Sequence, residues 1–150
     1  MEYSNEYAQD FSDKNFGKVR GVRNLYADGR VPNGYTKVGD LVYNIDGKQC
    51  LGTTKYRGKG LSDVYLYKAA FVANEQLYLT MGHEYMHALY NSYNLFNDKL
   101  QHKVIYQWEY DQAVAFSYNV SKYEANLSFI KLPKTSKYNI NTFPIIKLIK

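Results

Sequence analysis

Two histidines and a glutamate lie close together in the stretch LTMGHEYMHALY, residues 79–90. His83 and His87 are four residues apart, so on a helix they share one face and can bind one metal ion through their imidazole nitrogens. Glu84 is rotated by about 100° along the helix and leans over the ion without binding it. A zinc hydrolase requires this division of roles. The ion lowers the pKa of a bound water towards about 7, and the glutamate accepts the remaining proton as the water attacks a carbonyl.

A catalytic zinc ion has three protein ligands and an open position, so a third ligand must come from elsewhere in the chain. Glu109 follows His87 by 22 residues, far enough for the chain to turn and return, and Ala113 one turn later would let two helices approach closely. Asp111 points to a different helical face, and His102 precedes the expected second helix. We favour Glu109, with Asp111 and His102 as alternatives. A carboxylate that does not bind the ion would hydrogen-bond a ligand histidine.

The two helices that must position these side chains are visible as apolar stripes. The first is expected to begin with Asn74 as its N-cap and to end near residues 91–94, where asparagines and a serine cluster. Gly82 lies inside it and is a poor helix former, so we expect another group to pack closely at that point. The second helix is expected at 104–125, with 95–103 as a loop.

The rest of the chain is expected to form smaller elements. Residues 1–35 contain many turn signals and predict a loop-rich outer segment with one short helix or strand. Asp46-Gly47, between two apolar runs, predicts a hairpin with a type I′ turn. The run DVYLYKAAF, residues 63–71, predicts a strand whose edge holds an extended substrate. With a tail at 131–150, these elements predict a single α+β domain over residues 1–150.

The segments HEYMH and YQWEYDQAVAF resemble the gluzincin branch of zinc metallopeptidases. More narrowly, residues 74–120 look like the metallopeptidase-like domains at the C-terminal ends of bacterial polymorphic toxins, including those attached to RHS-repeat proteins. The resemblance implies a zincin-like fold in which a small antiparallel sheet or hairpin packs on the active-site helix. It also implies Zn²⁺, a protein or peptide substrate, delivery by a larger secreted protein and an immunity protein as a partner.

Carried over to this chain, the family pattern makes His83 and His87 ligands, Glu84 the general base and Glu109 the third ligand. The family often has alanine three positions after that glutamate, whereas here Ala113 is four positions on, which keeps Asp111 open. The metzincin pattern is excluded, because the histidine and glycine that it requires after HEYMH are both replaced by tyrosine.

Composition limits the other function classes. The net charge of +5 comes from dispersed basic residues, apart from Lys55, Arg57, Lys59 and the tail, so no basic stripe indicates a nucleic-acid partner. No apolar run is long enough to cross a bilayer, and the polar N-terminus does not match a signal peptide. We therefore expect a cytoplasmic chain or a piece of a larger exported protein. Most of the 17 tyrosines, and the lone Cys50, are expected to be structural. The alternative to a hydrolase is a non-catalytic, tyrosine-rich basic binding module.

Overall fold

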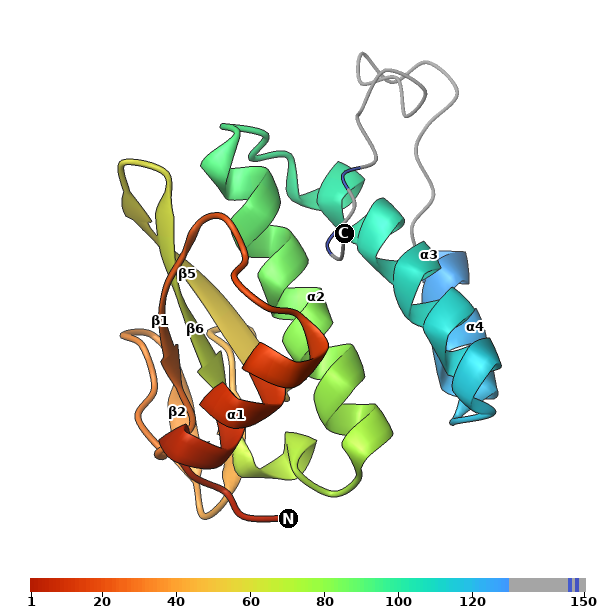
Figure 1. Cartoon of the computed structure of the whole chain (residues 1–150), viewed down its shortest axis with the longest axis horizontal. Coiled ribbons are helices and arrows are strands. Elements are labelled where there is room, and N and C mark those ends of the chain that lie inside the picture. Colours follow the sequence, from red (N-terminus) through yellow and green to blue (C-terminus); the bar gives the residue numbers. More distant parts are fainter. Residues whose placement is uncertain (130–145, 147, 149–150) are drawn as a thin grey trace.

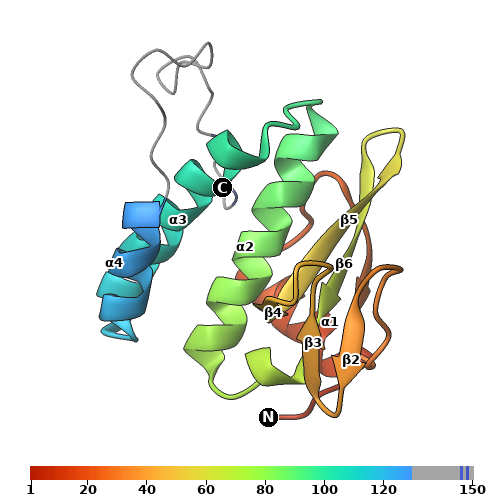
Figure 2. The same ribbon diagram turned by 180° about the vertical axis from the view of Figure 1, so that it is seen from behind.

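Helices and two small sheets make up the computed structural model, which describes residues 1–129, 146 and 148 (Figures 1 and 2). Along the chain, the elements are α1 (Asn5–Asn15), β1 (Val22–Tyr26), β2 (Thr36–Val38), β3 (Leu41–Tyr43), β4 (Gln49–Cys50), β5 (Gly52–Gly58), β6 (Leu61–Leu66), the short 3₁₀ helix η1 (Lys68–Ala70), α2 (Asn74–Ser92), α3 (Asp98–Phe116) and α4 (Val120–Phe129). The α+β class expected from the sequence is confirmed. The expected tail lies almost entirely outside the described residues. Among the described helices, none has the length and apolar character needed to cross a membrane.

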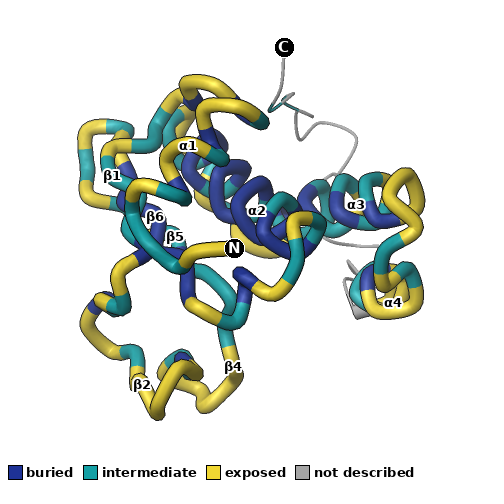
Figure 3. Tube along the Cα trace, turned by 60° about the horizontal axis from the view of Figure 1, so that its bottom comes forward, coloured by how far each residue is buried: buried dark blue, intermediate teal, exposed yellow. Residues whose placement is uncertain are grey.

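The larger sheet has the strand order β1-β6-β5, with β1 parallel and β5 antiparallel to the central strand β6. Side chains alternate between the two faces of β6. Val64 and Leu66 belong to the core cluster that contains Leu77 and Met81 of α2, so this face of the sheet is covered by the helix. Figure 3 shows α2 at the centre of the molecule with most of its length buried. The helix that carries the expected metal ligands is therefore the core helix of the fold.

The opposite face of β6 is covered by the small antiparallel sheet β2-β3-β4. Tyr65 and Tyr67 pack there with Val42 of β3. Asp63 is also buried on this face, where its carboxylate forms ion pairs with Arg23 at 2.8 Å and Arg57 at 2.9 Å. Burial opposes the charged carboxylate, but the two guanidinium groups outweigh this and lower the pKa of Asp63.

The predicted hairpin is confirmed as β3 and β4, whose pairing places Tyr43 opposite Gln49. Its turn is wider than expected. Residues 44–48 form the loop, and Asn44 folds it by accepting hydrogen bonds from the backbone N–H groups of Asp46 and Lys48 at 3.0 and 2.9 Å. Of the expected pair, only Gly47 has a positive φ (79°), whereas a type I′ turn requires positive φ at both central residues.

The N-terminal segment is more regular than the turn signals predicted. Ser4 caps α1 by accepting a hydrogen bond from the N–H of Tyr7 at 3.1 Å, and β1 completes the larger sheet beside β6. Residues 1–35 therefore contribute both a helix and a strand to the fold. The prediction allowed for only one short helix or strand and did not locate the helix, because its mostly polar sequence carries little apolar periodicity.

Helix α2 confirms the helix predicted around His83 and His87, with one shift at its start. Ala73 is the N-cap and Asn74 is the first helical residue. The expectation of a close contact at Gly82 is also confirmed, because a Cβ atom added there would lie 2.1 Å from Cη2 of Trp108 on α3. Ala113 of α3 is buried against Leu79 of α2. These small residues let α2 and α3 approach closely.

The predicted second helix is wrong at both ends. Helix α3 starts at Asp98, where Asn97 caps it by accepting a hydrogen bond from the N–H of Leu100 at 3.0 Å. It ends at Phe116, because Ser117 has left-handed backbone geometry (φ 53°), and α4 begins only after a second such residue, Asn119. The expected loop 95–103 therefore contains the first turns of α3, and His102 lies on a helix.

Candidate metal centre

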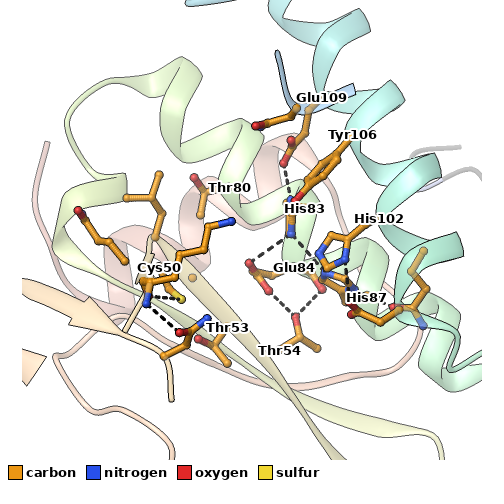
Figure 4. A pocket seen from close by; sticks show the side chains of 18 of the residues that line it. Cys50, Thr53, Thr54, Thr80, His83, Glu84, His87, His102, Tyr106 and Glu109 are labelled. Atoms are coloured by element: carbon orange, nitrogen blue, oxygen red, sulfur yellow. Dashed lines mark hydrogen bonds and ion pairs between the residues drawn. The ribbon is translucent and has the colours of Figure 1, made fainter. Parts of the chain in front are cut away.

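Three imidazole rings meet between α2 and α3 (Figure 4). His83 and His87 come from successive turns of α2, and His102 comes from the second turn of α3. Nε2 of His87 lies 3.2 Å from Nε2 of His83 and 3.1 Å from Nε2 of His102. Nitrogens that bind one zinc ion tetrahedrally at about 2.0–2.1 Å are roughly 3.3 Å apart. The three rings therefore lie close enough to hold one metal ion.

The Nδ1 atom of each ring has a separate partner. His83 contacts Oε1 of Glu109, His87 contacts Oε1 of Gln101 at 2.7 Å, and His102 contacts Oδ2 of Asp98 at 3.0 Å. Each partner oxygen accepts a hydrogen bond, so each Nδ1 carries the proton. In the neutral rings this leaves the Nε2 lone pairs free and aimed at one another, which is the tautomer that metal coordination needs.

The partner of His87 is held with a defined orientation. Gln101 is 2% exposed, and its amide nitrogen donates to Oδ1 of Asn91 at 2.9 Å and to the carbonyl of Leu95 at 2.5 Å. These two acceptors fix the nitrogen on one side, so the oxygen must face His87. A buried amide thus selects the tautomer of the central ring without adding charge.

Glu109, the favoured third ligand, lies at the site, but its carboxylate contacts Nδ1 of His83, on the side of the ring away from the other two histidines. This is the supporting position that we expected for a carboxylate that does not bind the ion. The third side chain whose nitrogen faces the Nε2 atoms of His83 and His87 is His102. Asp98, His102 and Glu109 are spaced by four and seven residues, so the early start of α3 places them on one helical face. Asn97 followed by Asp98 is a helix-start signal in the sequence that indicated this register.

Asp111, the other alternative, does not join this group. Its side chain is exposed and accepts a hydrogen bond from Gln107, four residues earlier, at 3.0 Å. It lies on the solvent side of α3, as its offset of two residues from Glu109 requires.

The carboxylates of the site determine which histidine is charged when no metal is bound. Burial disfavours a protonated His83, but the carboxylates of Glu109 and Glu84 outweigh it and raise the pKa of His83 to about 9. Burial and the two neighbouring histidines lower the pKa of His87 to about 3. Without a metal, a proton on His83 therefore pairs with Glu109 at neutral pH, and His87 stays neutral.

Glu84 lies beside the rings and against strand β5. Its Oε2 is 3.9 Å from Nε2 of His83, and its Oε1 is 2.9 Å from the hydroxyl of Thr54. Burial raises the pKa of Glu84. On the same strand, Gly52 leaves room for this side chain, because a Cβ atom added there would lie 2.9 Å from Cγ of Glu84. Strand β5 therefore determines where the carboxylate can lie.

The rings and Glu84 line a cavity of about 680 Å³. One wall comes from the residues 48–54 around β4 and the start of β5, the floor from α2, and the other wall from α3 and α4. Tyr106 lies inside it, with its ring centroid 5.1 Å from that of His102 and 6.0 Å from that of His83. Burial, with Glu109 as the next contribution, raises the pKa of Tyr106, so its hydroxyl keeps a proton at neutral pH.

The prediction that residues 63–71 form a strand with a free edge for a substrate is wrong. Residues 63–66 belong to β6, which is the central strand and pairs with β1 and β5 on its two sides, so it has no free edge. Residues 68–70 form η1 instead of continuing the strand. Strand β5 lies at the end of the described sheet, and Gly52, Thr53 and Thr54 line the cavity.

Comparisons of the chain with protein families, with curated proteins and with solved structures find no match.

Proposed function

We propose that the protein is a zinc-dependent peptide-bond hydrolase with His83, His87 and His102 as metal ligands and Glu84 as general base. The observation that carries this proposal is the convergence of three Nε2 atoms beside a buried carboxylate, inside an open cavity. A purely structural metal site is closed by four ligands, whereas three protein nitrogens leave a position for water or substrate.

The donor set fits zinc. Imidazole nitrogen is a preferred zinc ligand, and hydrogen-bonded Nδ1 atoms hold the rings in place and raise their basicity. Glu109, Gln101 and Asp98 supply these hydrogen bonds. When bound, a zinc ion would polarise the substrate carbonyl and acidify a water molecule.

Glu84 supplies the proton transfer. Burial raises the pKa of its carboxyl above the ordinary value, which makes it a better proton acceptor. The hydrogen bond from Thr54 and the space above Gly52 keep the carboxylate next to the metal ligands, and not among them. Glu84 accepts a proton from the attacking water and donates it to the leaving amine.

Two further groups suit a peptide substrate. The hydroxyl of Tyr106, beside His83 and His102, is the candidate donor to the negative charge that develops on the carbonyl oxygen. Strand β5 offers its outer edge along the cavity, where an extended peptide could add by backbone hydrogen bonds.

Metal analysis and peptide cleavage on matched variants test this proposal. The wild type should contain one zinc per chain and cleave peptides. Glu84→Gln should keep the zinc and lose cleavage by at least 100-fold, since it removes the proton acceptor. If the protein is a non-catalytic binding module, the wild type and Glu84→Gln should both fail to cleave peptides. Absence of stoichiometric zinc in the wild type would overturn the proposal.

The same analysis assigns the third ligand. His102→Ala should lose the zinc, while Glu109→Gln should keep it with an affinity about 10–100-fold lower, as for other partners of ligand histidines. Asp111→Asn is the matched control and should behave as the wild type. If Glu109→Gln lost the zinc and His102→Ala kept it, Glu109 would be the ligand.

The resemblance to polymorphic-toxin domains adds the proposal that this hydrolase is the effector domain of a larger secreted bacterial protein. It is supported by the motif, not by the comparisons. Production of the wild type inside bacterial cells should then stop growth, and Glu84→Gln should not. Equal growth with both proteins would contradict the effector role and leave the hydrolase proposal standing.

A further inference from the structure

The cavity extends beyond the metal centre towards the N-terminal half of α2. Gln76 and Thr80 of α2 line that part, and Gln76 precedes His83 by seven residues, which is about 10 Å along a helix. Two sides enclose it: the β3–β4 turn with Lys48, and α4 with Lys122 and Asn126. Figure 2 shows the β3–β4 hairpin and α4 on opposite sides of α2.

Charge is divided unevenly along this cavity. The acidic residues that line it are Glu84, Asp98 and Glu109, and each is already engaged by Thr54, His102 or His83 at the metal end. The lysines that line it are Lys48 and Lys122, and within the described part of the chain neither forms an ion pair with a carboxylate. The two lysines of the cavity lining therefore carry positive charge that no carboxylate among the described residues pairs with.

The positions of both lysines are tied to the cavity wall. The backbone carbonyl of Lys48 accepts a hydrogen bond from the N–H of Asn44 at 2.8 Å, which holds the turn that carries this lysine, and Cys50 two residues later lines the same cavity. On the other side, Nζ of Lys122 lies 5.4 Å from the ring centroid of Tyr123, whose hydroxyl is bound by Gln76 at 3.2 Å.

Hydrogen-bond donors accompany these charges. Thr80 is 6% exposed and accepts a hydrogen bond from Gln76 at 2.9 Å, and among the described residues its own proton has no hydrogen-bond acceptor, so it can be donated to a ligand. Asn126 is four residues after Lys122 and lies on the same face of α4. Hydroxyl, amide and ammonium donors without a competing carboxylate are suited to an anionic oxygen pair.

We propose that this end of the cavity is a specificity subsite for an acidic side chain, aspartate or glutamate, within about three residues of the scissile bond. Lys48 and Lys122 provide the opposite charges, and Thr80 provides a hydrogen bond from the floor. The distance follows from the roughly 10 Å between Gln76 and His83 and the 3.3 Å that each residue of an extended peptide spans. This inference rests on the proposed function, because it places the scissile carbonyl at the three histidines.

Peptide hydroxamates test the subsite without requiring turnover, because the hydroxamate group binds zinc directly. Two series are used, with the hydroxamate at either end of a short peptide, and each series compares glutamate with glutamine at one position at a time. Binding to the zinc-loaded wild type is measured by calorimetry. At one position of one series, the glutamate compound should bind about 3- to 10-fold more tightly at low salt, as expected for partly exposed ion pairs. The preference should shrink at 0.5 M salt.

Matched variants assign the preference to the lysines. The double variant Lys48→Gln with Lys122→Gln should bind the two compounds equally. Lys14→Gln removes the same charge on α1, outside the cavity lining, and should keep the wild-type preference. Equal binding of glutamate and glutamine compounds by the wild type, or a preference that survives in the double variant, would overturn the subsite alone. Binding of neither compound would overturn the metal-dependent hydrolase, and the subsite with it.

Discussion

At the scale of single residues, the motif predicted the placement of its own three side chains better than that of the residues around them. His83, Glu84 and His87 lie as a helix with this spacing requires. The choice between Glu109 and His102 could not be made in the same way, because it depends on where α3 begins. An earlier start does not turn Glu109, but it places His102 on the helix and on the same face as Glu109. Pattern reasoning is least reliable at such boundaries.

Thr54 gives the first prediction at this scale. Its hydroxyl bonds to Oε1 of Glu84 at 2.9 Å and lies 2.8 Å from the backbone carbonyl of the same residue. Thr54→Val keeps the shape but removes the hydrogen bond, and hydrogen bonds to charged groups contribute about 1.5–3 kcal/mol. We expect kcat for peptide cleavage to fall about tenfold or more with an unchanged zinc content. Thr54→Ser should retain most of the activity. Wild-type kcat in Thr54→Val would show that the strand does not position the base.

The proton on His83 gives a second prediction. Its pKa is raised to about 9 in the metal-free protein, so at pH 7 the ring must lose a proton before Nε2 can bind zinc. The apparent zinc affinity should therefore rise about tenfold per pH unit from this group between pH 6.5 and 8.5, and level off above pH 9. Calorimetry in buffers of different ionisation enthalpy measures the protons released. Glu109→Gln removes the charge that raises this pKa, so it should show a weaker dependence. A pH-independent affinity in the wild type would contradict the assignment of His83 as a ligand.

At the scale of elements, the sequence predicted those with strong local signals and missed those defined by packing. The core helix α2 and the β3–β4 hairpin were found from apolar periodicity and from Asp46-Gly47. The start of α3 was missed because the polar segment 97–103 shows little apolar periodicity, although it contains a cap. The central position of β6 depends on β1, which pairs with it from about 40 residues earlier in the chain. No local pattern reports such pairing.

Gly82 carries a prediction about the contact between α2 and α3. In Gly82→Ala, the new methyl group would lie 2.1 Å from Cη2 of Trp108, and overpacking of this kind destabilises by about 1–3 kcal/mol. That exceeds the gain of about 1 kcal/mol that alanine gives over glycine in a helix. We expect a lower free energy of unfolding in urea.

The matched double variant provides the control for this contact. When Trp108→Leu is already present, the ring that obstructs the methyl group is absent. Adding Gly82→Ala to that variant should then be neutral or stabilising, because only the helix propensity of alanine remains. A stabilising effect of Gly82→Ala in the wild type would mean that Trp108 moves aside without loss.

At the scale of the whole molecule, a bound cation would connect two packed units. The sheet and α2 form one core, and α3 with α4 lies on the other side of α2 (Figure 1). Because the histidines come from both α2 and α3, metal binding should stabilise the folded chain. At a free zinc concentration 100 times the dissociation constant, the gain is about 2.7 kcal/mol, or roughly 5–10 °C in the melting temperature.

Thermal unfolding with zinc and with a chelator measures this coupling. His83→Ala should melt at the same temperature under both conditions, since it lacks a ligand. If the melting temperature of the wild type is the same with zinc and with a chelator, the three histidines do not bind zinc in the folded state.

The uneven origin of the three histidines has a consequence for metal exchange. Two of them belong to the core helix and one to its neighbour, so a small outward movement of α3 removes one nitrogen while the other two stay in place. If the three histidines bind an ion as proposed, its release should proceed in two stages, and the first stage would be a movement of α3 away from α2. The rate at which a chelator strips the metal would therefore report how often α3 opens, and the packing at Gly82 and Trp108 would set that frequency.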